Sequence, residues 1–249
     1  MQTQATPDAC SAIAQNIEAV RAAIEDAQKT SPYDKPVTLM AVTKTVDVDR
    51  INYAIDACGI RCIGENRVQE LCDKYPHLHL DGVSVHLIGS LQSNKVKYIA
   101  DKVDLIHSLD SLSLAKEIDR QAKKHDRIID CLIEINIGRE ENKGGIEPDD
   151  DAVLAFYDAV SVYENIRVTG LMTIAPNCAQ DPDPDARYTA YFSETRRLFE
   201  RLTAERLCRK PDLTPILSMG MSGSYRPAIL CGADIVRVGS GIFGARNYT

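Results

Sequence analysis

One lysine lies at a position in the sequence where its side chain could take part in a chemical reaction. Lys44 closes the apolar segment VTLMAVTK (37–44). Such a run predicts a strand buried on both faces, so a lysine at its end should lie at a cleft or at the mouth of a barrel. Poor hydration there favours the neutral amine that Schiff-base chemistry requires. The alternative is a strand-end side chain that extends to water.

Two segments rich in small residues form a second candidate. SMGMSGS (218–224) and VGSGIFG (238–244) both lie at the ends of strand-like runs. Small residues let backbone N–H groups approach an anion, and the start of a helix adds favourable polarity. We therefore predict that the two segments bind a phosphate group together. Tight turns between elements are the alternative interpretation.

Strand-like and helical stretches alternate along the chain and predict the fold. The strand-like runs are 37–44, 61–66, 84–90, 104–110, 128–137, 166–174, 215–220 and 234–244. The helical stretches include 48–58, 94–103, 114–125 and 186–207. Eight such units in 249 residues predict an α/β protein with a single (β/α)8 TIM barrel. A doubly wound open sheet would need a phosphate-binding G-x-G-x-x-G turn after an early strand, and none of the early strand-like runs is followed by one.

A further helix, over about residues 8–28, precedes the first strand. We predict one barrel domain over 1–249, in which 1–36 are an N-terminal helix and lead-in.

A barrel would gather the residues at the carboxyl ends of its strands into one site. These are Lys44, Asn66, Ser90–Gln92, Asp110, Asn136, Met172, Ser218–Ser222 and Gly239–Ser240. A lysine opposite an anion site fits a sugar phosphate held as a lysine imine. It also fits pyridoxal 5′-phosphate (PLP), which carries an aldehyde and a phosphate. Arg237 either projects into this mouth or is a salt-bridged strand residue.

Composition and charge narrow the classes of function. The net charge is −7 and no long basic run occurs, which argues against nucleic acid as a partner. The apolar runs are too short to span a bilayer, and the N-terminus lacks a signal-peptide pattern. We expect a cytoplasmic protein whose eight cysteines are free thiols. No metal site is predicted, because Cys58, Cys62 and Cys72 match no standard zinc spacing.

A series of ordered motifs resembles the YggS/PROSC family of pyridoxal phosphate homeostasis proteins. The motifs are AVTKT (41–45), IGENRVQE (63–70), HLIGSLQSNK (86–95), EINIGREENKGGI (134–146), GLMTI (170–174), SMGMSGS (218–224) and VRVGSGIFGARNY (236–248). The resemblance covers about residues 37–249. It implies a PLP fold-type-III barrel, similar to the N-terminal domain of alanine racemase.

The resemblance also implies roles for individual residues. Lys44 is implied to be the Schiff-base lysine and Arg237 to face the pyridine nitrogen. The other implied cofactor-binding residues are Asn66 near the ring, and Met221, Ser222, Gly223, Gly239 and Ser240 around the phosphate. One position departs from the family pattern, because Ser224 stands where an aspartate is usual. A serine can still cap the following helix.

The family resemblance implies a carrier of PLP rather than an efficient enzyme. Racemases of this fold add a C-terminal domain that supplies a second base, and we expect that domain to be missing because the chain ends soon after its last strand. An arginine at the ring nitrogen also weakens carbanion chemistry. The expected role is PLP homeostasis and delivery, with transient contacts to apo PLP-dependent enzymes, as a monomer or weak dimer. A racemase-like enzyme of low activity is the alternative, and a Schiff-base aldolase on a phosphorylated sugar is third.

Overall fold

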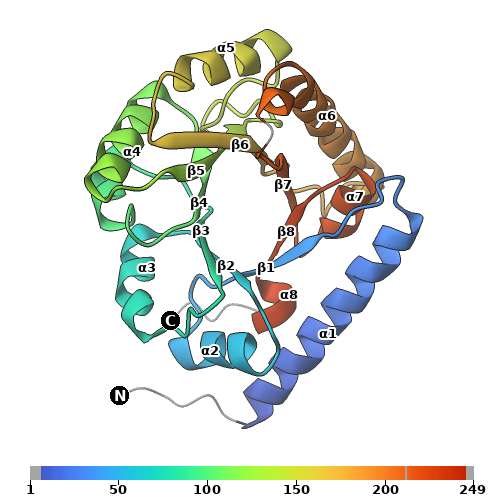
Figure 1. The fold of residues 1–249 in the computed structure, drawn as a ribbon. Helices are drawn as coiled ribbons and strands as arrows, with labels where there is room; N and C mark the ends of the chain where they lie inside the picture. Colours follow the sequence, from blue (N-terminus) through green and yellow to red (C-terminus); the bar gives the residue numbers. More distant parts are fainter. Residues whose placement is uncertain (1–6, 211, 245–249) are drawn as a thin grey trace.

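The strands of the computed structural model pair in parallel and in chain order, and β8 pairs back with β1 to close a barrel. They are β1 (Thr38–Val42), β2 (Cys62–Glu65), β3 (Ser84–Leu87), β4 (Leu105–Leu109), β5 (Ile129–Ile135), β6 (Ile166–Thr173), β7 (Ile216–Met221) and β8 (Ile235–Val238). The structure describes residues 7–210 and 212–244. Helices surround the ring of strands (Figure 1). The predicted (β/α)8 barrel is thereby confirmed.

The helices lie between successive strands, except for α1, which precedes β1, and α8, which follows β8. They are α1 (Pro7–Thr30), α2 (Val48–Asp56), α3 (Val68–Lys74), α4 (Leu112–Lys124), α5 (Asp150–Val160), α6 (Pro184–Glu205), α7 (Tyr225–Leu230) and α8 (Ser240–Phe243), with 3₁₀ helices η1 (Tyr75–His77), η2 (Ser93–Tyr98) and η3 (Leu207–Arg209). The stretch 94–103 therefore begins as a 3₁₀ helix, in which Ile99 N–H donates to the Val96 carbonyl at 3.0 Å. The run 234–244 also divides, into β8 and α8.

The apolar core has two parts, because successive strand residues point to opposite faces. The inner part fills the barrel and consists of Met40, Val42, Cys62, Ile88, Leu105, Leu132, Met172 and Ile235. The outer part packs between strands and helices. It includes one stripe of α1, where Ile13, Ile17, Val20 and Ile24 are buried at helical spacing.

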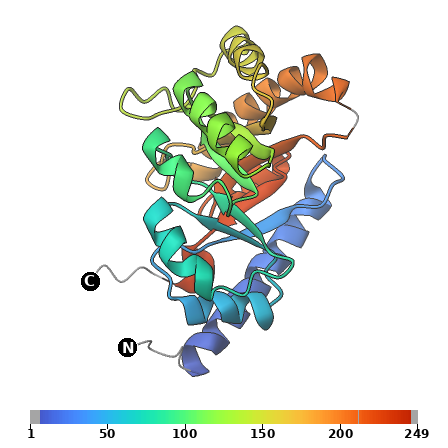
Figure 2. The same ribbon diagram turned by 60° about the vertical axis from the view of Figure 1, so that its left-hand side comes forward.

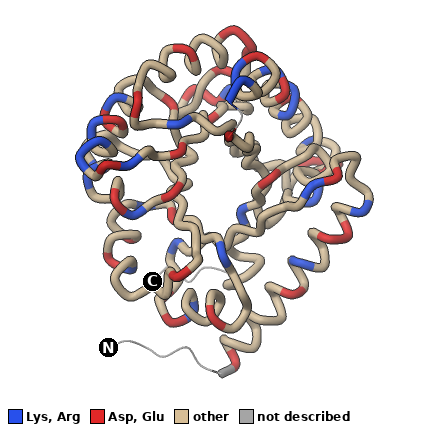
Figure 3. Tube along the Cα trace, in the orientation of Figure 1, with Lys and Arg blue, Asp and Glu red and all other residues tan. Residues whose placement is uncertain are grey.

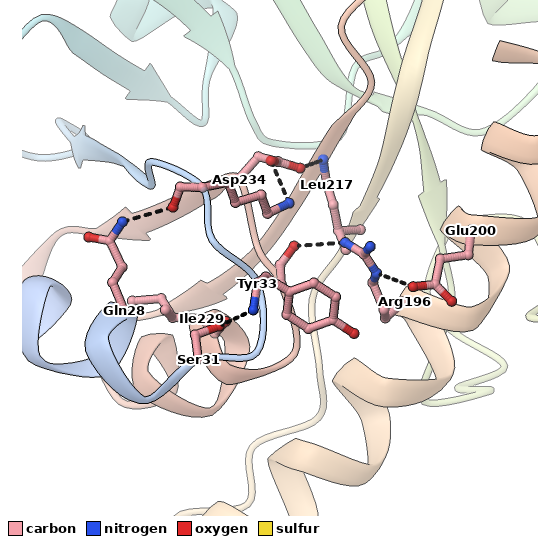
Figure 4. A network of polar contacts seen from close by, with 10 residues as sticks. Gln28, Ser31, Tyr33, Arg196, Glu200, Leu217, Ile229 and Asp234 are labelled. Carbon is pink, nitrogen blue, oxygen red and sulfur yellow. Dashed lines mark hydrogen bonds and ion pairs between the residues drawn. The ribbon is translucent and has the colours of Figure 1, made fainter. Parts of the chain in front are cut away.

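The additional helix α1 lies outside the ring of strands, beside α7 and α8 (Figures 1 and 2). Its connection to β1 is anchored where β7 and β8 begin (Figure 4). There Asp234 accepts hydrogen bonds from Lys35 Nζ at 2.6 Å and from Leu217 N–H at 2.7 Å. The Arg196 guanidinium lies 4.2 Å from the centre of the Tyr33 ring. This network lies at the amino ends of the strands, so the connection between α1 and β1 is anchored away from the predicted site.

Residues of both charges are interspersed over the outer helices (Figure 3). In the described part of the chain, no helix is long and apolar enough to cross a membrane. The same residues include no group of three or more His, Cys, Asp or Glu side chains that could hold a metal ion. Each of the eight cysteines is a free thiol. Residues 245–248, the end of the last sequence motif, lie outside the described residues.

Candidate functional site

Lys44 lies in a turn and not at the end of a strand. The strand β1 ends at Val42, two residues before the position that the sequence predicts, and Lys44 is half-buried. The buried Thr43 still pairs with β2, because its N–H donates to the Gly64 carbonyl at 3.0 Å. Thr45 then adopts a left-handed conformation with a φ of 62° and turns the chain away from the barrel. Lys44 therefore leaves the strand at the carboxyl end, where the site of such barrels lies.

The two small-residue segments meet next to the Lys44 turn. The Ser222 hydroxyl oxygen accepts hydrogen bonds from the N–H groups of Gly239 and Gly241, both at 3.3 Å. A Cβ atom on Gly239 would lie 3.3 Å from Val42 Cβ, so this turn packs against the end of β1. Two backbone donors and one hydroxyl therefore converge beside Lys44.

Other residues predicted for the phosphate site border this convergence. Met221 ends β7 and is exposed, as are Gly223 and Ser240. A side chain at Gly223 would meet open space, because no other heavy atom lies within 4 Å of its Cβ position. These residues therefore lie at the edge of the site, whereas Ser222, Gly239 and Gly241 form its centre.

Arg237 lies inside the barrel below this site. Its side chain is 4% exposed. Nη1 donates to Ser218 Oγ and Nη2 to the Thr173 carbonyl, both at 2.7 Å. Burial lowers the pKa of Arg237 to about 10, and the nearby Glu134 opposes that change. The guanidinium therefore remains a charged donor near neutral pH, held in place by these two hydrogen bonds.

A chain of hydrogen bonds continues from Ser218 through the barrel. His107 Nδ1 lies 3.1 Å from Ser218 Oγ, and His107 Nε2 lies 2.9 Å from His86 Nδ1. His86 Nε2 lies 2.8 Å from Ser84 Oγ, which in turn lies 3.3 Å from Asp104 Oδ2. Asp104 precedes β4, so the chain joins Arg237 near the mouth to the amino ends of the strands.

The chemistry of the two histidines fixes the direction of this chain. Burial lowers the pKa of His86 to about 4 and that of His107 well below its usual value, so both rings are neutral. A neutral imidazole has one donor and one acceptor nitrogen. Because Ser218 already accepts from Arg237, its own proton is available to His107 Nδ1. Each ring then donates through Nε2, and Ser84 donates to Asp104. In this direction every donor has an acceptor.

Two further polar groups lie at the mouth. Asn66 follows β2, and within the described residues its buried Oδ1 has no hydrogen-bond partner. Glu134 is on β5, two residues after the inward-facing Leu132 and paired with Met172. Burial, and secondarily the negative charge of Asp110, raise the pKa of Glu134 to about 7. The mouth therefore contains an unpaired acceptor and a carboxyl group that titrates near neutrality.

Comparison with known proteins places this site in a family. Residues 10–247 match the family model described as "Alanine racemase, N-terminal domain". A pyridoxal phosphate homeostasis protein of Aquifex aeolicus is 40% identical over 97% of this chain and 100% of its own length. The protein of the same name from Escherichia coli strain K12 is 36% identical over 95% of this chain and 98% of its own. The chain belongs to the family of pyridoxal phosphate homeostasis proteins.

Solved structures with the same barrel include one that has PLP bound. The PLP-bound structure of PipY from Synechococcus elongatus is 32% identical, covers 93% of this chain and 100% of PipY, and superposes with a TM-score of 0.76. An alanine racemase of Clostridium difficile is 14% identical, covers 94% of this chain and 58% of the racemase, and has a TM-score of 0.67. The racemase comparison shows the shared fold alone.

The position that departs from the family pattern has a different role from the expected cap. Ser224 is the N-cap residue of α7, but its side chain makes no capping hydrogen bond. Its buried hydroxyl instead accepts from the Met221 N–H at 3.1 Å. Ser224 therefore tightens the loop that carries Ser222, because its hydroxyl bonds back to the residue that ends β7.

Three residues expected at the mouth have other positions or roles. Met172 is fully buried in the inner core. Asn136 closes its own loop, accepting from Glu140 N–H at 3.1 Å and donating to the Glu140 carbonyl at 3.0 Å. Asp110 lies against the loop of Gly144, where a Cβ atom would be 2.7 Å from its carboxylate. Sequence reasoning missed Glu134 and His107, although each is a polar residue within an apolar run.

Proposed function

We propose that this protein binds PLP as a Schiff base on Lys44 and takes part in PLP homeostasis and delivery within the cell. PLP supplies an aldehyde that condenses with an amine and a phosphate that fixes its position. The observation that carries the proposal is the convergence of Gly239 N–H, Gly241 N–H and the Ser222 hydroxyl beside the Lys44 turn. The two N–H groups donate to Ser222 Oγ, and a phosphate oxygen placed beside them would accept from these N–H groups and from the Ser222 hydroxyl. The PLP-bound PipY structure supports the same ligand.

The remaining residues of the mouth have proposed roles around that ligand. Asn66 offers its unpaired Oδ1 to a ligand donor. Arg237 faces the pyridine nitrogen as a charged donor, and a group with a pKa of about 10 keeps its own proton. The ring nitrogen then stays unprotonated, which limits catalysis. Met221, Gly223 and Ser240 border the phosphate.

Covalent loading of Lys44 is the direct test. Purified protein is loaded with PLP, reduced with borohydride, digested and analysed by mass spectrometry. We expect the cofactor-sized adduct on the peptide that contains Lys44, and no adduct in Lys44→Ala. Lys116→Ala is the matched control, because Lys116 is exposed on α4. An adduct on another lysine, or none after loading, would refute the assignment.

Delivery is tested by transfer to an apo-enzyme that depends on PLP. Loaded protein and an equal amount of free PLP are compared in the presence of a scavenger that captures PLP from solution. Activation that survives the scavenger only with loaded protein supports direct hand-over. If the scavenger abolishes activation equally in both samples, the protein only stores PLP and releases it to solution, which would contradict delivery by direct contact.

A racemase-like enzyme of low activity is the second candidate, and Glu134 is the observation that favours it. A carboxyl group with a pKa of about 7 is suited to accept a proton near neutrality. Deuterium exchange at the α-carbon of a panel of amino acids distinguishes the candidates. We expect exchange far below the rates of metabolic enzymes, which are about 1–10³ per second; rates in that range would overturn the carrier proposal.

We further propose that the barrel acts as one domain, as a monomer or weak dimer, in the cytoplasm. The closed β1-to-β8 ring, which uses strands from the whole described chain, supports the single domain. Sedimentation over a range of concentrations and fractionation of the source cells test the assembly and the location. A tight dimer, or protein found only in a membrane or secreted fraction, would contradict the proposal.

A further inference from the structure

The turn that carries Lys44 is strained at its next residue. Thr45 has a φ of 62°, in the left-handed region. A β-branched side chain rarely adopts this conformation, since its Cβ substituents crowd the backbone. Such strain persists only where surrounding contacts hold it, and it is frequent at functional sites. The contacts around Thr45 therefore identify what holds the Lys44 turn.

Three side chains from β2 and α3 hold this turn. We call Glu65, Glu70 and Lys74 the acid–lysine clamp. Glu70 Oε1 accepts from Thr45 N–H at 2.5 Å and from Lys74 Nζ at 2.5 Å. One carboxylate oxygen thus joins the strained residue to the ammonium group. That ammonium group also lies 3.2 Å from Glu65 Oε2.

The clamp also holds the residue on the other side of Lys44. Lys74 Nζ donates to the Thr43 carbonyl at 2.8 Å. The Thr43 hydroxyl donates to Glu65 Oε2 at 2.9 Å. The contacts are shielded from water, since the side chains of Glu65 and Lys74 are 1% and 12% exposed. Shielding strengthens charged hydrogen bonds relative to exposed ones.

We propose that Glu65, Glu70 and Lys74 are positioning residues, which fix the direction of Lys44 by holding the main chain on both of its sides. This inference rests on the proposed function, because it assigns the clamp to the PLP-binding lysine. A simple surface ion pair between α3 and the barrel would not need to reach Thr43 and Thr45. The clamp lowers the conformational freedom of the turn before the ligand arrives, and pre-organisation of this kind increases affinity.

The test separates the hydrogen bond from the charge. Glu70→Gln keeps an oxygen that can accept from Thr45 N–H, whereas Glu70→Ala removes it. PLP affinity is measured by absorbance titration. We expect Glu70→Ala to bind about tenfold more weakly and Glu70→Gln to retain more of the wild-type affinity. Glu117→Ala, which breaks the Arg120 ion pair on α4, is the control and should bind PLP as wild type does.

A second substitution tests whether the clamp acts by holding Thr45 in its strained conformation. Glycine adopts a positive φ readily, so Thr45→Gly should reduce the effect of Glu70→Ala. An equal loss of affinity from Glu70→Ala in the Thr45 and Gly backgrounds would overturn the proposal. A smaller loss in the Gly background supports it. Circular dichroism confirms that each variant folds. If Glu70→Ala does not fold, Glu70→Gln takes its place in the comparison.

Hydrogen exchange in ligand-free protein distinguishes failure of the clamp from failure of the proposed function. The Thr45 amide should be protected in wild type and in Glu70→Gln, and should exchange faster in Glu70→Ala. That result supports the clamp even where Lys44→Ala still yields the borohydride-fixed PLP adduct, which would refute only the Schiff-base assignment. Equal protection of the Thr45 amide in all three proteins would refute the clamp.

Discussion

Replacing His86 by glutamine should make the fold less sensitive to acid. His86 is 6% exposed, and burial lowers its pKa to about 4. The unfolded value is about 6.5, so the unfolded chain takes up the proton first as the pH falls. The contribution of the neutral, buried His86 to the free energy of unfolding is therefore complete above about pH 6.5 and is lost as the pH falls below that value. Glutamine retains one donor and one acceptor for Ser84 and His107.

The size of the effect follows from these two pKa values. At about pH 5 the unfolded imidazole is mostly charged and the folded one is neutral, which destabilises the fold by about 2 kcal/mol relative to about pH 8. Glu134 acts in the opposite direction. Its folded pKa of about 7 is raised, so its contribution increases as the pH falls through that value. Only the difference between wild type and variant therefore isolates His86.

Urea unfolding at about pH 5 and about pH 8 measures this difference. Wild type should lose about 2 kcal/mol more stability than His86→Gln between the two pH values. His125→Gln is the control, because His125 is exposed at the end of α4, and it should follow wild type. Equal losses in wild type and His86→Gln would show that the folded protein does not keep His86 neutral. The direction assigned to the hydrogen-bond chain would then be wrong.

Three further predictions concern the mouth of the barrel. Ser222→Ala should weaken PLP binding by about tenfold to a hundredfold, the effect of one hydrogen bond to a charged group, while binding of pyridoxal changes little; equal wild-type affinity for the two vitamers would exclude a phosphate site. Arg237→Glu should increase deuterium exchange at the α-carbon of added amino acids, since an acid favours the protonated ring; normal PLP binding with unchanged exchange would make Arg237 a structural residue. Wild-type PLP affinity should fall as the pH rises through about 7 and Glu134 ionises beside the anionic ligand; Glu134→Gln should flatten this profile, and an unchanged profile would refute the assignment.

The barrel and the place of its mouth could be predicted because they depend on local pattern. Each apolar run is short and is followed by a helical stretch, which restricts a parallel sheet to few topologies. The ends of these runs then locate Lys44 and Ser222. The exact end of β1 could not be predicted, because Thr43 is as compatible with a strand as Val42. The strand ends earlier because Thr45 turns to a positive φ, which depends on Glu70 and thus on another element.

The polar interior could be predicted only in part, because the sequence placed Ser218 and Arg237 near the mouth but did not place the two histidines. His86, His107, Ser218 and Arg237 each interrupt an apolar run, and from the sequence each could face solvent at a helix boundary or the inside of the barrel. A one-residue change of register reverses the face of every side chain in a strand. Only closure of the ring, with Met40 paired to Arg237 and Ser218 to Met172, places these polar groups inside.

Once inside, the four groups constrain one another. A buried polar side chain without a partner is strongly unfavourable, and the surrounding inner core is apolar. The histidines can satisfy the serine and each other only as neutral rings that donate in one direction, from Arg237 toward Asp104. A charged ring would have two donors, one of which would point at the donor nitrogen of the next ring or at Ser218 Oγ, which already accepts from Arg237. The interior therefore couples the protonation of His86 to the donor geometry of Arg237, although the two residues make no direct hydrogen bond with each other.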